Sequence, residues 1–152
     1  MGRLTKRFVG LIASAVLVVM LAGCYDLPNQ LQGPVAIRDS DNGLEVLLCH
    51  SVEAANFILE VREDGKWERA WVAQGGADIV SGQSITAGSI GEVFPSATIL
   101  SNEFGNATDI SVVITAKTSD ENVVAGFDAS KLDSQNWLHP DDSLTAIPCE
   151  NS

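Results

Sequence analysis

Asp64-Gly65 is the feature that most restricts the fold of this chain, because it separates two segments of strand character. Asp-Gly favours a two-residue type I′ turn, in which both residues take positive φ angles. The flanking segments, Asn56 to Val61 and Trp67 to Ala73, have the β-branched, aromatic and alternating composition of strands. The sequence therefore predicts a β-hairpin in which Glu63 pairs with Lys66.

Counting outward from this turn assigns the two faces of the hairpin. One face carries two indoles, two arginines and a glutamate in three predicted pairs: Arg62 with Trp67, Glu60 with Arg69 and Ile58 with Trp71. The other face is mostly aliphatic, again in three predicted pairs: Val61 with Glu68, Leu59 with Ala70 and Phe57 with Val72. We therefore expect Trp67 and Trp71 to project from one partly solvated face, while the aliphatic face joins the core.

Short strand signals recur along the chain with turn residues between them: Pro34–Arg38, Leu44–His50, Ser84–Ala87, Ser96–Leu100, Asp109–Lys117, Val123–Phe127 and Leu144–Cys149. One or two helical turns are predicted within Ser130 to Trp137, with Ser130 as the N-cap. This spacing predicts a single all-β domain over residues 34–152. We expect an antiparallel β-sandwich of immunoglobulin-like architecture, with a small β-barrel as the alternative. Period-2 alternation places these side chains in its core: Val46, Leu48, Phe57, Leu59, Val61, Ile110, Val112 and Ile114.

The N-terminus has the pattern of a signal peptide. A basic start is followed by the nearly unbroken apolar run Phe8 to Met20, and small residues precede Cys24. From Phe8 to Gly23 is 16 residues, which is short of the roughly 20 that a transmembrane helix needs. An ordinary secretory signal is the other alternative, but it would leave Cys24 as a free thiol in an oxidising compartment.

Leu21-Ala22-Gly23-Cys24 resembles the lipobox of bacterial lipoproteins, in which the cysteine is acylated, as with palmitate, and becomes the N-terminus. The resemblance implies that residues 1–23 are removed and that acylated Cys24 anchors the protein to the cell membrane on its extracytoplasmic face. Residues 24–33 are polar and contain a proline, so we interpret them as a tether between membrane and domain.

If Cys24 is acylated, Cys49 and Cys149 remain as the one possible intramolecular pair. A disulfide is the expected state outside the cytoplasm, and a redox or metal-binding pair is disfavoured because the chain has no Cys-x-x-Cys motif. The order of strand, cysteine, hairpin, late strand and cysteine loosely resembles small uncharacterised lipoproteins of actinobacteria. That resemblance implies no activity.

The predicted mature chain is strongly acidic. Without the leader it keeps six Lys and Arg against 20 Asp and Glu, a net charge of −14. Such a surface repels phosphate backbones, so nucleic-acid binding is not expected. The same charge disfavours a second, electrostatic contact with anionic lipid.

No motif in the sequence predicts a metal or cofactor. His139-Pro140-Asp141-Asp142 contains imidazole and carboxylate ligands, but the proline and the acids are ordinary turn chemistry. Asp39 to Gly43 fails as an EF-hand loop, because Gly43 and Leu44 occupy the fifth and sixth positions and His50 the twelfth. A looser calcium site between loops stays open.

No Gly-x-Ser-x-Gly elbow, Walker loop or Gly-x-Gly-x-x-Gly motif occurs, so we do not expect an enzyme. The predicted function is a noncatalytic binding or structural module that contacts a cell-wall polymer, a carbohydrate or another envelope protein. The alternative is an envelope hydrolase with an unsignalled carboxylate and histidine site. The candidate contact surface gathers five residues: Trp67, Trp71, Arg62, Arg69 and Glu60. Burial of both indoles between the sheets is the competing interpretation.

Overall fold

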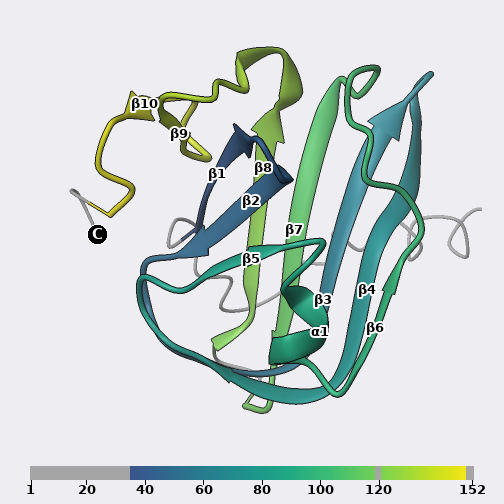
Figure 1. Cartoon of the computed structure of the whole chain (residues 1–152), viewed down its shortest axis with the longest axis vertical. Helices are drawn as coiled ribbons and strands as arrows, with labels where there is room; N and C mark the ends of the chain where they lie inside the picture. Colours follow the sequence, from purple (N-terminus) through teal and green to yellow (C-terminus); the bar gives the residue numbers. More distant parts are fainter. Residues whose placement is uncertain (1–34, 119–120, 150–152) are drawn as a thin grey trace, which may run out of the picture.

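The computed structural model describes residues 35–118 and 121–149, which form two antiparallel five-stranded sheets packed face to face (Figure 1). The strands are β1 (Val35–Ser40), β2 (Gly43–Leu48), β3 (Val52–Glu63), β4 (Lys66–Ile79), β5 (Ser84–Thr86), β6 (Ser96–Ile99), β7 (Asp109–Ala116), β8 (Val123–Asp128), β9 (Trp137–Leu138) and β10 (Leu144–Thr145). The first sheet has the order β10-β9-β1-β2-β5, and the second has the order β6-β4-β3-β7-β8. Two separate open sheets confirm the predicted β-sandwich over the barrel.

The core lies between the two sheets and is filled by alternate side chains of their strands. Every residue that the alternation predicts for the core is buried: Val46, Leu48, Phe57, Leu59, Val61, Ile110, Val112 and Ile114. The opposite parity of the second sheet, which includes Ile58 and Val113, is only partly buried. This parity forms the outer face of the second sheet.

The β3–β4 hairpin begins in the predicted register. Asp64 and Gly65 have φ angles of 49° and 78°, as a type I′ turn requires, and Glu63 pairs with Lys66. The register then shifts by one residue, because Glu60 pairs with Arg69 while the next pair is Leu59 with Trp71. Ala70 is the extra residue of a β-bulge.

Because of this bulge, the predicted faces of the hairpin are wrong beyond Arg69. Three predicted pairs are wrong: Ile58 with Trp71, Leu59 with Ala70 and Phe57 with Val72. The Ala70 carbonyl accepts hydrogen bonds from the backbone N–H groups of Leu100, at 2.8 Å, and Ser101, at 3.2 Å. The Trp71 indole Nε1 donates to the Ser101 carbonyl at 3.1 Å, so the bulge turns this indole into the core with its polar atom satisfied.

Both hairpin strands are longer than predicted, and their pairing has a second irregularity in the added part. The pairing of β3 with β4 shifts between Ala54 and Asn56, opposite Gly75 and Gly76, whose φ angles are 100° and 80°. Glycine tolerates these angles at little cost. The shift changes the parity of β3, so that Ala54 faces the core together with Phe57.

The predicted helical turns within Ser130 to Trp137 are largely wrong. The structure has one 3₁₀ turn, η3 (Ala129–Lys131), and its N-cap is Asp128, whose side chain accepts from the Ser130 N–H. Trp137 belongs to β9, which pairs with β1 and β10. One short helix that the sequence did not predict, α1 (Ile90–Val93), places Ile90 in the core.

The predicted leader, Cys24 and the tether lie outside the described residues. Within the described part of the chain, no helix has the length and apolar character that a membrane span requires.

Candidate functional site

The outer face of the first sheet is covered by the C-terminal segment. Trp137 is buried with Ala36, Leu47 and Cys49 in a small second cluster, against which Cys149 packs. Ala36 pairs with Leu47 across β1 and β2, on the side of the sheet away from the main core. The C-terminal segment therefore closes this face with a hydrophobic cluster of its own.

Two further contacts hold that cover in place. The Arg38 guanidinium carbon lies 4.3 Å from the centroid of the Trp137 ring, a cation–π contact. Arg38 also donates from Nε to the Glu45 carboxylate at 2.7 Å. The predicted disulfide between Cys49 and Cys149 is confirmed, with 5.3 Å between their Cα atoms. It fastens the segment to the end of β2.

The outer face of the second sheet has no comparable cover among the described residues. The strand register arranges its side chains in rows that cross β4, β3, β7 and β8. One row carries an aromatic and three charged side chains, in the order Trp67, Arg62, Asp109 and Asp128. The next row is polar, and its side chains become shorter toward β8, in the order Arg69, Glu60, Ser111 and Gly126. A third row is apolar, in the order Val72, Ile58, Val113 and Val124.

Trp67 is the exposed aromatic residue of this face. This residue is 48% exposed, whereas Trp71 is fully buried. The predicted pair of surface indoles is therefore wrong, and the physical reason is the bulge at Ala70. Four residues of the candidate contact surface remain together on the outer face: Trp67, Arg62, Arg69 and Glu60.

Ion pairs order the charged groups around Trp67. Arg62 Nη1 lies 3.7 Å from Asp109 Oδ2, and Arg69 Nε lies 3.7 Å from Glu60 Oε1. Exposed pairs of this kind contribute little to stability. They do hold planar hydrogen-bonding groups beside the indole, and both guanidinium groups keep N–H donors available to a ligand.

Trp71 has a structural role instead. Its ring packs against Phe57, with centroids 6.4 Å apart, and makes a T-shaped contact with Phe104, with centroids 6.1 Å apart. Together with the hydrogen bond to Ser101, these contacts tie the loop after β6 to the core.

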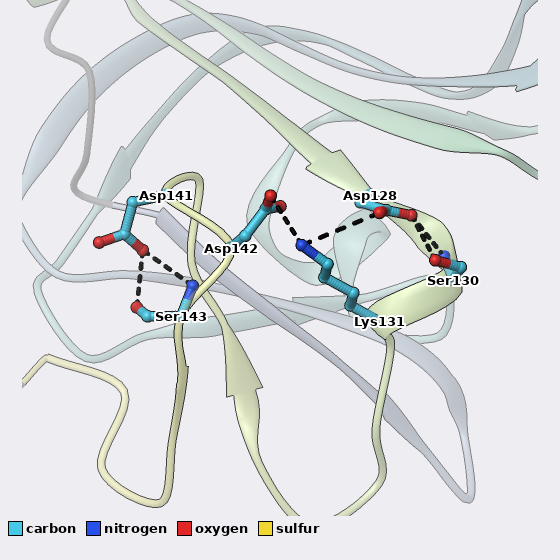
Figure 2. Close-up of polar contacts among 6 residues, drawn as sticks. All are labelled: Asp128, Ser130, Lys131, Asp141, Asp142 and Ser143. Atoms are coloured by element: carbon cyan, nitrogen blue, oxygen red, sulfur yellow. Dashed lines mark hydrogen bonds and ion pairs between the residues drawn. The ribbon is translucent and has the colours of Figure 1, made fainter.

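Charged groups also gather where η3 meets the turn before β10 (Figure 2). Lys131 Nζ lies 2.8 Å from Asp142 Oδ2 and 4.0 Å from Asp128 Oδ2. The bond to Asp142 raises the pKa of Lys131. The Ser130 hydroxyl and N–H donate to Asp128 and lower the pKa of that carboxyl.

The neighbouring turn follows the same pattern. The Ser143 hydroxyl and N–H donate to Asp141 and lower the pKa of its carboxyl (Figure 2). The described side-chain contacts of these acids lie within the two turns or join η3 to the turn before β10, so we assign this cluster to local structure.

The two histidines lie apart from the outer face of the second sheet. His50 is exposed in the link between β2 and β3. His139, in the turn that joins β9 to β10, contacts the Thr145 hydroxyl of β10 through Nε2 at 2.7 Å. Within residues 35–118 and 121–149, no three His, Cys, Asp or Glu side chains are placed to hold a metal ion.

Ser111 and Gly126 are members of the site that sequence reasoning missed. Both lie on the parity of β7 and β8 opposite to the core residues Val112 and Ala125. A Cβ added at Gly126 would meet no atom within 4 Å, so the space above this position is open. Once Ile110, Val112 and Ile114 were assigned to the core, the alternation already placed Ser111 on the outer face.

Comparisons with known proteins give this chain no relative: no family model, curated protein or solved structure matches it.

Proposed function

We propose that this chain is a lipid-anchored, noncatalytic binding module on the extracytoplasmic face of the cell membrane. The basic, apolar and small-residue leader before Cys24 supports the anchor. The disulfide between Cys49 and Cys149 is in keeping with an oxidising compartment.

The observation that carries the binding function is the contrast between the two outer faces. The outer face of the first sheet is covered by the C-terminal segment, which is held there by a buried indole and a disulfide. The second sheet leaves Trp67 exposed among ordered charged groups, and the polar row separates it from the apolar row. Tryptophan and arginine, which meet here as Trp67, Arg62 and Arg69, are enriched in recognition surfaces.

The topology directs this surface away from the proposed anchor. Val35, the first residue of β1, pairs with Leu48 at the end of β2, and a short link joins Leu48 to Val52. From Val52, β3 runs 12 residues to the hairpin turn, a length of roughly 35 Å. The start of β1 and the Trp67 end of the hairpin therefore lie at opposite ends of β3 (Figure 1). This separation supports a module whose Trp67 end is remote from an anchor that precedes Val35.

The anchor is tested by the variant Cys24→Ser. We expect the wild-type protein in the membrane fraction, with an N-terminal peptide that starts at Cys24 and is heavier by its acyl groups. The variant should leave that fraction. A wild-type N-terminus at another residue would contradict the anchor.

The binding function is tested with the purified domain and isolated cell-envelope material. We expect wild-type protein to sediment with the envelope and Trp67→Ala to lose most of that binding without a change in melting temperature. The double variant Val80→Ala and Leu144→Ala is a matched control, because it removes exposed apolar side chains outside the outer face of the second sheet. Equal sedimentation of wild type and Trp67→Ala would contradict the proposal, and release of soluble sugar or peptide from the envelope would favour the hydrolase alternative.

A further inference from the structure

We propose that the ligand of this outer face is an uncharged polysaccharide that lies across the strands, with one sugar ring stacked on Trp67. This inference rests on the proposed binding function of the same surface and adds the chemical class of the ligand. Its track follows the polar row from Arg69 and Glu60 to Ser111 and Gly126.

The groups beside Trp67 match what a sugar offers. A pyranose ring has an apolar C–H face, which packs on an indole, and a rim of hydroxyl groups. Trp67 is 48% exposed, and its cross-strand neighbour Arg62 is ion-paired with Asp109. Carboxylates accept from hydroxyl groups and guanidinium groups donate to them, so each pair offers both halves of a hydroxyl's hydrogen bonds.

The charges favour an uncharged ligand. Three of the six basic residues that follow the leader lie on this hairpin: Arg62, Lys66 and Arg69. Arg62 and Arg69 are already paired with acids, and Lys66 lies opposite Glu63 in the strand register, so little positive charge remains for an anion. The predicted mature chain carries a net charge of −14, which repels polyphosphates and polyuronates.

The shape of the polar row gives the ligand its direction. Glu60 precedes the short side chain of Ser111, which is followed by Gly126, where a Cβ would meet no atom within 4 Å. The row is bordered on one side by Asp109 and on the other by Val113. Three strand intervals separate β4 from β8, a span of about 14 Å, which suits a short run of sugar units.

The ligand class is tested by treating isolated envelope material in two ways before the sedimentation assay. Periodate cleaves the vicinal diols of sugars, whereas protease removes proteins. We expect binding to be lost after periodate and retained after protease. Binding that survives periodate and is lost after protease identifies a protein partner and overturns this inference while the proposed binding function stands. Wild-type protein that binds no better than Trp67→Ala on untreated envelope overturns both.

The track is tested by the variant Gly126→Gln, which adds an uncharged side chain in open space on the polar row. We expect it to weaken binding to protease-treated envelope at least tenfold at unchanged melting temperature. Gly91→Gln is the matched control, because an added Cβ also meets no atom there and α1 lies at the end of the sandwich away from the hairpin turn (Figure 1). Equal affinity of the two variants overturns the track.

Ionic strength tests the charge of the ligand. We expect less than about a twofold change in affinity when salt is raised from roughly 0.05 to 0.5 M, because screening acts on charged partners. A steep loss of affinity with salt identifies an anionic polymer and overturns the inference.

Discussion

Replacing Trp71 with alanine should damage the fold far more than replacing Trp67, although the two residues are four apart on one strand. Trp71 is fully buried against Phe57 and Phe104, and the loss of a buried tryptophan costs about 3–5 kcal/mol of unfolding free energy. Its indole N–H also bonds the Ser101 carbonyl, a contact worth about 1 kcal/mol within that total. Trp67→Ala should change stability by no more than about 0.5 kcal/mol, as is usual for surface positions.

Thermal unfolding of the mature chain, followed by far-UV circular dichroism, measures both variants. A loss of 3–5 kcal/mol should lower the melting temperature by roughly 10–20 °C for a domain of this size. Iodide quenching adds an independent measurement, because Trp67 is exposed while Trp71 and Trp137 are buried. Trp67→Ala should remove nearly all the quenchable fluorescence. Similar melting temperatures for the two variants, or strong quenching that persists in Trp67→Ala, would refute the bulge at Ala70.

Three further perturbations have distinct expected results. Cys149→Ser should lower stability by roughly 2–5 kcal/mol in chemical denaturation, and an unchanged midpoint would contradict the role of the disulfide as a fastener. The pKa values of Asp128, Asp133 and Asp141 are lowered by hydrogen bonds to their charged forms, so the stability they add is present at neutral pH and is lost as pH falls below about 4. As pH falls, amide protection factors in residues 128–143, measured relative to the intrinsic exchange rate at each pH, should decrease before those of the core strands. A simultaneous decrease in both would disprove the local role. Gly65→Ala should cost about 1–2 kcal/mol, because φ at this position is 78°, and a neutral effect on the melting temperature would argue against the type I′ turn.

Much of the sandwich could be predicted because the residues that determine its turns and strands are close together in the sequence. The Asp64-Gly65 turn and the alternation of Ile110, Val112 and Ile114 each depend on neighbours in sequence, and the structure confirms both. The Cys49–Cys149 disulfide followed from the cysteine count once Cys24 was assigned to the lipid.

The part of the site that could not be predicted depends on distant contacts. The bulge at Ala70 is held by the N–H groups of Leu100 and Ser101, which lie 30 and 31 residues further along the chain, and no local pattern marks it. The strand pairs counted from the turn were therefore correct as far as Arg69, and beyond it the predicted faces of the β4 residues were reversed. The disulfide predicted that the C-terminal segment is fastened to an early strand, but the packing of Trp137 on Leu47 could not be predicted, since it depends on tertiary contacts.

Hydroxyl-radical footprinting of the domain bound to envelope material tests most directly whether the outer face of the second sheet is the contact surface. We predict that oxidation of Trp67 falls several-fold on binding and that peptides carrying Ser111 and Val124 are protected with it. The C-terminal cover, reported by Leu144 and Ile147, should be oxidised at the same rate in the free and bound states. Protection of that cover with Trp67 still fully reactive would contradict the account.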